Sequence, residues 1–264
     1  MAYSRRMSTR YPGCVVVLID QSASMDQAIA GHTQSTRAQA VAAATDGLLD
    51  ELVQRCLKND DSIMPWCDVA VLGYGGQGIR SIFPQGFVST ADLDQYALPD
   101  TAETTGPTEI IGPLKRWITP VFDGMTPMAE ALERAKRMVD TWIQAHPDSF
   151  PPVVLNVTDG RANTSDPQIP ATQLRDLHTS DGHVLLFNLH LSDSIEQRVE
   201  YPATPPQVAD DYAGMLYDMS SVIPPQLVET SQFPLKAGAR GFVFNGGAAS
   251  LLHFFMWGTP AGAL

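Results

Sequence analysis

Three short oxygen-bearing side chains follow the first apolar stretch of the chain at alternate positions. Residues 15–19 are all valine, leucine or isoleucine, and they lead directly into Asp20, Ser22 and Ser24. Such a continuous apolar run is typical of a strand buried on both faces of a parallel sheet, and binding sites in these sheets lie beyond the carboxyl ends of the strands. Because hard cations such as Mg²⁺ take oxygen ligands, one interpretation is a metal site. The other is a capped loop that enters a helix.

Two later stretches favour the metal site. Thr126 begins the sequence T-P-M-A-E-A-L, which opens a helical pattern, and residues 153–158 form a second apolar strand that ends in Asp159-Gly160. The order D-x-S-x-S, then T-P-M, then strand-V-T-D-G resembles the von Willebrand factor A domain with its metal-ion-dependent adhesion site. The resemblance covers residues 13–258, and it is to the bacterial intracellular type of this family.

The resemblance implies roles for five residues. In that family the two serines and the threonine bind the cation directly, and the two aspartates act mostly through water. The implied inner ligands are therefore Ser22, Ser24 and Thr126, with Asp20 and Asp159 outside them. The cation is Mg²⁺ or another divalent ion such as Mn²⁺ or Ca²⁺. Three neutral hydroxyls leave positions for water, one of which an Asp or Glu of a partner protein can replace.

The resemblance therefore favours a protein-interaction module and not an enzyme. Related intracellular proteins work beside MoxR-type AAA+ ATPases, protein kinases or PP2C-type phosphatases, in signalling, stress or conflict systems. The enzymatic alternative is a Mg²⁺-dependent phosphoryl-transfer hydrolase with Asp20 as nucleophile, but such sites carry a second carboxylate where this chain has Ser22. No G-x-S-x-G motif for a serine hydrolase occurs. A metal-independent scaffold that uses an acidic surface is the remaining alternative.

Other patterns near these motifs are predicted to be structural. Residues 73–78 match G-x-G-x-x-G, yet a strand ended by Pro84 follows where a dinucleotide site needs a helix. A glycine-rich hairpin, or close packing against the metal loops, is the expected role. We expect Asp26, Asp123 and Asp166 to be capping or solvated acids. The six histidines show no metal-ligand spacing.

Composition limits the class of partner and the compartment. The 264 residues carry a formal net charge of −12, which argues against nucleic acid or an anionic membrane as the main partner. The three cysteines, Cys14, Cys56 and Cys67, show no C-x-x-C spacing and are expected to be buried free thiols. No signal peptide is visible, and the most apolar late run is too short to span a bilayer. A cytoplasmic location is predicted.

Strands and helices alternate along the chain, which predicts one doubly wound α/β domain with a mostly parallel sheet. The domain should cover residues 13–258, between a flexible basic tail at 1–12 and a short tail at 259–264. A long helix is expected over 33–58, and a second one with Thr126 as its N-cap. A short edge pair is expected between 79 and 88. The predicted strands lie at 67–74, 153–158, 183–191 and 241–245, and a closing helix at 248–257.

Overall fold

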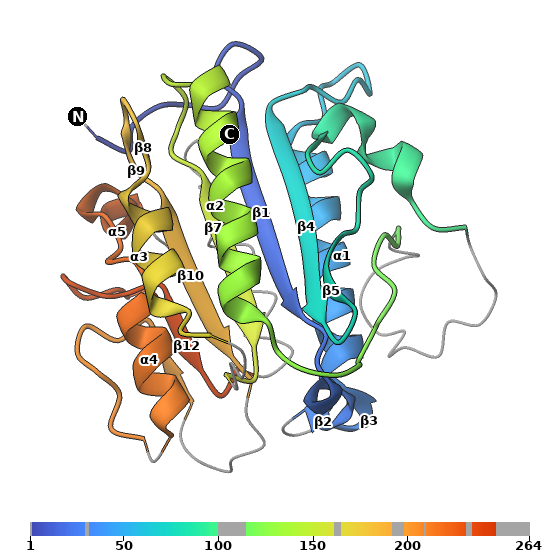
Figure 1. Ribbon diagram of the computed structural model, residues 1–264. Coiled ribbons are helices and arrows are strands. Elements are labelled where there is room, and N and C mark those ends of the chain that lie inside the picture. Colours follow the sequence, from blue (N-terminus) through green and yellow to red (C-terminus); the bar gives the residue numbers. More distant parts are fainter. Residues whose placement is uncertain are drawn as a thin grey trace.

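A mixed sheet lies between helices on both of its faces (Figure 1). The computed structural model describes residues 2–29, 32–99, 115–160, 165–191, 198–208, 210–230 and 234–246. Five parallel strands form the centre in the order β4, β1, β7, β10, β12. Their bounds are Cys67–Gly75, Gly13–Asp20, Val153–Thr158, Leu185–His190 and Phe242–Phe244. The predicted doubly wound α/β fold is confirmed.

The central strand β1 is apolar throughout because both of its faces are covered. Val15 and Val17 join the core under α1, whereas Val16 and Leu18 join the core under the opposite helices. On the first face lies α1 (Arg37–Arg55), and on the second lie α2 (Met128–Ala145), α3 (Gln168–Asp176) and α4 (Asp211–Met219). Burial of alternate residues on two sides removes the polar positions that a half-exposed strand would show.

Short antiparallel strands complete the two edges of the sheet. At one edge β11 (Val199–Glu200) pairs with β12. At the other, β5 (Gly78–Ser81) and β6 (Val88–Ser89) each pair with β4. The predicted edge pair at 79–88 was therefore wrong in its partner, because both strands take their hydrogen bonds from β4. The remaining elements are β2 (Ala28–Ile29), β3 (His32–Thr36), β8 (His178–Thr179), β9 (Gly182–His183), the 3₁₀ turns η1 (Ala23–Asp26) and η2 (Thr90–Tyr96), and α5 (Pro225–Thr230).

Two helix starts differ from the expectation. The first helix begins at Arg37, four residues later than predicted, because Thr36 and Gln39 form a capping box there. The second begins at Met128 with Pro127 as its N-cap, so the prediction of Thr126 as N-cap was wrong. Proline fixes a backbone angle that suits a helix start.

Residues 3–5 lie against the β8–β9 hairpin, within the segment 1–12 for which a flexible tail was expected. The backbone N–H of Tyr3 donates to the carbonyl of Asp181, and those of Ser4 and Arg5 donate to the Asp181 carboxylate. Met7 is buried in the core. Hydrogen bonds to one acidic side chain and an apolar anchor hold this segment. The closing helix predicted at 248–257 and the tail at 259–264 lie outside the described residues.

The prediction for the cysteines is confirmed. Cys14, Cys56 and Cys67 are free thiols with buried side chains, and burial raises the pKa of each. Thiols of this kind are chemically inert because the reactive thiolate is disfavoured away from water. Among the described residues, no helix is both long enough and apolar enough to cross a lipid bilayer.

Candidate metal centre

The chain reverses its direction across the sheet between β1 and β7. From β1 the chain moves to β4 on one side, and it later returns to place β7, then β10 and β12, on the other side. The loops that leave β1 and β7 therefore diverge at the carboxyl edge of the sheet. Ligands of open α/β sheets bind at such a switch point. Asp20 ends β1 and Asp159 follows β7, so both predicted acids lie at this place.

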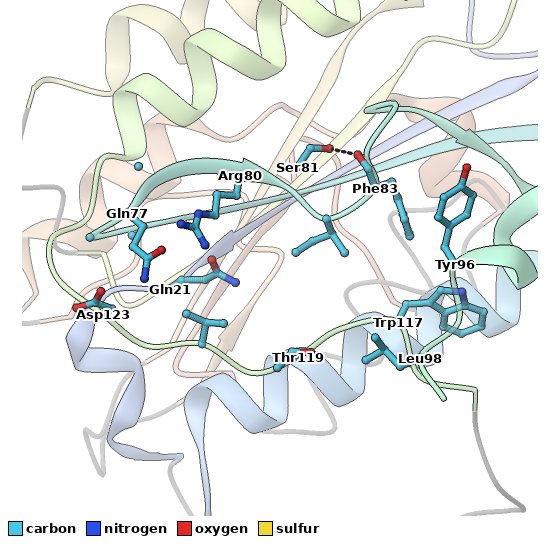
Figure 2. Close-up of a pocket in the computed structure, with 15 residues that line it drawn as sticks. Gln21, Gln77, Arg80, Ser81, Phe83, Tyr96, Leu98, Trp117, Thr119 and Asp123 are labelled. Atoms are coloured by element: carbon cyan, nitrogen blue, oxygen red, sulfur yellow. Dashed lines mark hydrogen bonds between the residues drawn. The ribbon is translucent and has the colours of Figure 1, made fainter. Parts of the chain in front are cut away.

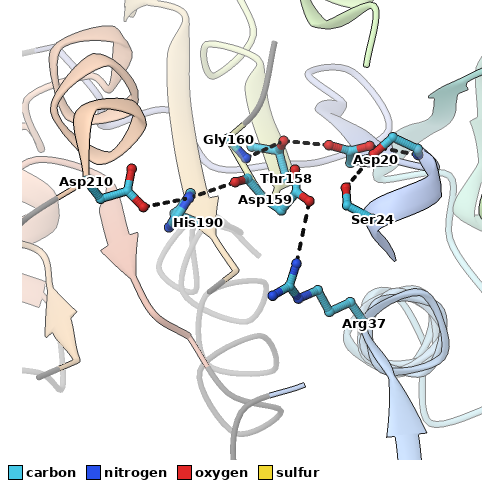
Figure 3. Close-up of polar contacts among 9 residues, drawn as sticks. Asp20, Ser24, Arg37, Thr158, Asp159, Gly160, His190 and Asp210 are labelled. Carbon is cyan, nitrogen blue, oxygen red and sulfur yellow. Dashed lines mark hydrogen bonds and ion pairs between the residues drawn. The ribbon is translucent and has the colours of Figure 1, made fainter. Parts of the chain in front are cut away.

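The first motif is ordered by hydrogen bonds to both oxygens of Asp20. Its Oδ1 accepts from the backbone N–H of Ser22 at 2.9 Å, and its Oδ2 accepts from the hydroxyl of Thr158 at 2.6 Å (Figure 3). The hydroxyl oxygens of Ser22 and Ser24 lie 3.1 Å apart. The two predicted serine ligands are thus brought together beside a buried carboxylate whose orientation is fixed.

The acid of the third motif is held by neighbouring elements. The carboxylate of Asp159 lies 3.5 Å from the guanidinium of Arg37, the first residue of α1. Its backbone carbonyl lies 2.8 Å from Nε2 of His190, at the end of β10 (Figure 3). Because a carbonyl can only accept, this nitrogen carries the proton. Asp210, which caps α4, lies 3.7 Å from the same nitrogen.

Electrostatics at the centre favour an added cation. Burial, and secondly the nearby charge of Asp159, raise the pKa of Asp20 to about 6. Both effects disfavour the charged form, since water is excluded and like charges repel. A divalent ion beside these acids would oppose both effects, and hydroxyl and carboxylate oxygens suit Mg²⁺. The residues at the centre therefore fit such an ion.

The loop that carries Thr126 is tied to the first motif. The N–H of Asp123 donates to the carbonyl of Gln21 at 2.6 Å, and the N–H of Ala23 donates to the carbonyl of Gly124 at 3.1 Å. Thr126 itself is buried. These backbone bonds bring the second motif to the first, so all three motifs meet at one edge of the sheet.

The glycines of the 73–78 motif serve close packing, as expected. They end β4 and begin β5, and the N–H of Gly76 donates to the carbonyl of Asp123 at 2.6 Å. Gly124 has φ of +66°, and a Cβ there would collide with the backbone of Gly76. Both positions need glycine because two backbones meet without room for side chains. This region is a hairpin packed on the loops of the first and second motifs.

Three residues of the centre were not predicted from the sequence. Arg37 lies on the apolar stripe of α1, four residues before Val41, and a charge in such a stripe was a signal that could have found it. The hydroxyl of Thr158 donates to the Asp20 carboxylate, and His190 donates to the backbone carbonyl of Asp159. Nothing local marks these two, because their partners lie 138 and 31 residues away in the sequence.

The three other acids have the roles expected of them. Asp166 accepts from the backbone N–H of Gln168 at the start of α3, and it is exposed. Asp26 is exposed in η1. Asp123 is exposed and contributes its backbone to the loop contacts described above. Within the described ranges, no group of three His, Cys, Asp or Glu side chains is placed so that it could hold a metal ion.

Comparison with known proteins supports the fold. No family model matches the sequence, and no curated protein matches it. Among solved structures, the pilus adhesin SpaC from Lactobacillus rhamnosus GG aligns with 96% of this chain and 30% of its own, at 12% identity and a TM-score of 0.53. Proximal thread matrix protein 1 from the mussel byssus aligns with 93% of this chain and 46% of its own, at 14% identity and a TM-score of 0.48.

A third structure is named for the family that the motifs resemble. The vWF domain of the type V pili tip protein Mfa5 from Porphyromonas gingivalis aligns with 59% of this chain and 40% of its own, at 17% identity and a TM-score of 0.37. The present chain spans less than half the length of each of these three structures. At such identities the likeness concerns the fold alone.

Proposed function

We propose that this chain is a protein-binding module whose centre holds a divalent cation, Mg²⁺ in the first place, and through it a carboxylate of a partner protein. Ser22, Ser24 and Thr126 would hold the ion through their hydroxyls, and Asp20 and Asp159 through water. The cation supplies a strongly positive point with open positions that an Asp or Glu oxygen can take. The proposal rests on the von Willebrand factor A resemblance of the motifs together with the geometry of the switch point.

One observation carries the proposal furthest. The hydroxyls of Ser22 and Ser24 lie 3.1 Å apart beside two buried acids. They lie at the switch point between β1 and β7, where the strand order of the sheet reverses. Capping does not account for this pair, because the side chain of Ser22 caps nothing at the start of η1. Adjacent hydroxyls of this kind are suited to sharing one cation.

A binding role is preferred to phosphoryl transfer because of how Asp20 is held. Its two oxygens accept hydrogen bonds from Ser22 and Thr158, so the orientation of the carboxylate is fixed and both oxygens are engaged. A nucleophile needs one oxygen directed at the substrate. The position two residues on, which carries a carboxylate in such hydrolases, is Ser22.

The partner and the compartment belong to the proposal as well. Free buried thiols suit the reducing cytoplasm. By resemblance to intracellular bacterial proteins, the partner is proposed to be a MoxR-type AAA+ ATPase, a protein kinase or a PP2C-type phosphatase that presents an acidic residue. A charge of −12 disfavours nucleic acid and anionic membranes as alternatives.

Calorimetric titration with Mg²⁺ tests the centre directly. We expect one site in the parent, and a loss of about 10- to 100-fold in affinity for Asp20→Asn or Asp159→Asn, because groups that orient ligands contribute on this scale. Ser22→Ala combined with Ser24→Ala should abolish binding. The control is Asp26→Asn, an exposed acid of the same segment. Unchanged affinity in all the variants would place any metal elsewhere.

Partner capture tests the second half of the proposal. Immobilised protein should retain its partner with Mg²⁺ and release it with chelator, and the double serine variant should retain nothing. Retention that survives chelator would favour the metal-independent acidic scaffold. Hydrolysis of a phosphoester by the purified protein, lost on Asp20→Asn, would favour the phosphoryl-transfer alternative.

A further inference from the structure

A cavity of about 340 Å³ adjoins the metal centre (Figure 2). It lies between the β4–β5 hairpin and the segment 117–123. Tyr96, Leu98 and Trp117 line one end of it, and Gln21, Gln77 and Arg80 line the other. An apolar body with a few polar groups at one end is typical of a binding pocket, and this volume is near the lower limit of about 300 Å³ for ligand sites.

The cavity and the metal centre share a wall. Gln21 stands between Asp20 and Ser22 in the sequence, and its side chain lies over Gly73, where a Cβ would collide with the amide. The carbonyl of Gln21 accepts from Asp123, another lining residue, at 2.6 Å. The backbone that presents the serine ligands on one side therefore forms part of the cavity on the other.

Arg80 places a positive charge at the polar end of the cavity. Its guanidinium lies beside Gln77 and Gln21 in the close-up, and it makes no hydrogen bond or ion pair with any described residue (Figure 2). In a chain with a net charge of −12, a cation that forms no ion pair with a described acid can bind oxygen atoms of another molecule. Carbonyl or carboxylate oxygens are the groups it would bind.

Exposed apolar side chains continue from the cavity toward the third hydroxyl ligand. Val121, Phe122 and Met125 are 39%, 45% and 57% exposed, and all three precede Thr126 on one short segment. Large apolar side chains gathered beside a polar site are typical of surfaces that a protein partner covers. This strip extends the contact area beyond the cavity, which a small free molecule would not use.

We propose that the cavity receives a bulky apolar side chain, aromatic in the first place, from the same extended partner segment whose acid binds the cation. Arg80 and the amides of Gln21 and Gln77 bind main-chain carbonyl oxygens of that segment. The proposal rests on the proposed function, and it adds a specificity pocket to it. The partner motif is then an acid followed or preceded by an aromatic residue, and not an acid alone.

A displayed library of peptides, each with one fixed Asp among randomised residues, tests the proposal. Selection on the parent protein in Mg²⁺ should enrich aromatic residues at a constant spacing from the Asp. Thr119→Trp fills the cavity from its exposed lining and should weaken the selected peptides at least tenfold while leaving Mg²⁺ affinity unchanged. Thr141→Trp, the same change at an exposed site on α2, is the control. Arg80→Met should lower the affinity for the selected peptides without changing the spacing between their Asp and aromatic residues.

The outcomes separate this proposal from the proposed function. Mg²⁺-dependent peptides without an enriched aromatic residue, or with unchanged affinity for Thr119→Trp, would overturn the cavity proposal and leave the metal site standing. Aromatic peptides selected equally well in chelator would support the cavity and overturn the role of the cation. A library that yields no peptide under either condition would contradict both.

Discussion

The guanidinium of Arg37 lies 3.5 Å from the carboxylate of Asp159, and each side chain is 4% exposed. Arg37 is the first residue of α1, where the partial positive charge of the helix end disfavours a cation. Asp159 offsets this cost, and Arg37 in turn supplies positive charge to a pair of buried acids. The ion pair joins α1 to the loop after β7 at the metal centre, so both stability and metal binding should depend on it.

Arg37→Met tests this dependence. Removal of one partner of a buried ion pair typically costs about 3–5 kcal/mol. We expect the variant to have a lower melting temperature than the parent in chelator. Mg²⁺ should raise the melting temperature of the variant by more than that of the parent, because the added cation then provides the missing positive charge. Thermal unfolding with and without Mg²⁺ measures both effects.

Arg55→Met is the matched control on the same helix. Arg55 pairs with Glu51 at the protein surface, with side chains 21% and 36% exposed. Exposed pairs at this spacing contribute about 0.3–0.5 kcal/mol, so a small change that is independent of Mg²⁺ is expected. If Mg²⁺ shifts Arg37→Met and the parent equally, the ion pair and the metal centre are uncoupled.

Thr158→Val removes the hydroxyl that donates to Oδ2 of Asp20 and keeps the shape of the side chain. Hydrogen bonds to charged groups contribute about 1.5–3 kcal/mol, and a loss of stability in this range is expected. A carboxylate held by the Ser22 N–H alone should also lower Mg²⁺ affinity about tenfold, as the loss of other groups behind a metal ligand does. Thr45→Val, which removes a buried hydroxyl that donates to the Val41 carbonyl inside α1, controls for burial alone. Equal metal affinity in the two variants would contradict the role of Thr158.

Features encoded by neighbouring residues could be predicted from the sequence. Residues 15–19 reveal a doubly covered strand because every position is apolar, and Asp20, Ser22 and Ser24 are close in space because they are close in sequence. The fold class followed from the same kind of local pattern. Neither Asp46 nor Arg37 was predicted, because their partners, the 117–118 backbone and Asp159, lie far away in the sequence.

Features that depend on distant residues could not be predicted. The strands β5 and β6 were expected to pair with each other, yet each pairs with β4, and nothing local specifies which neighbour a short strand takes. The bond between His190 and the Asp159 carbonyl is set by the order of β7 and β10 in the sheet. Such contacts follow only after the topology is known.

Thr126→Ala should separate metal binding from partner binding. Ser22 and Ser24 alone can keep much of the Mg²⁺ affinity, whereas the partner carboxylate favours a cation whose shell is completed by the third hydroxyl. A ligand shifts such an equilibrium only by its differential affinity for the two states. We therefore expect most of the Mg²⁺-dependent partner affinity to be lost in Thr126→Ala, and both affinities to be lost in Ser22→Ala. Thr126→Ser keeps a hydroxyl and should behave as the parent. Parent-like partner affinity in Thr126→Ala would contradict this role.

Asp46 ties α1 to the segment that leads to the cavity and to Thr126. Its Oδ1 accepts from the backbone N–H groups of Trp117 and Ile118, at 2.8 and 3.0 Å. Burial raises the pKa of Asp46 from 3.8 to about 6. Between these two values the folded state binds more protons than the unfolded state, so the contribution of this group to stability falls as the pH rises through the window.

Asp46→Asn should remove that fall and keep an oxygen that accepts both hydrogen bonds. Relative to the parent, the variant is expected to gain stability as the pH rises from about 4 to 6, and then to hold a constant advantage above pH 6. Urea unfolding in chelator at several pH values measures the difference between the two curves. Asp50→Asn removes the same charge from the same helix, at a carboxylate that does not bind the 117–118 backbone, and is the control. If the free energy of unfolding changes with pH in the same way for the parent and Asp46→Asn, burial does not raise the pKa of this acid. The two backbone hydrogen bonds to its carboxylate would then outweigh the effect of burial on the pKa.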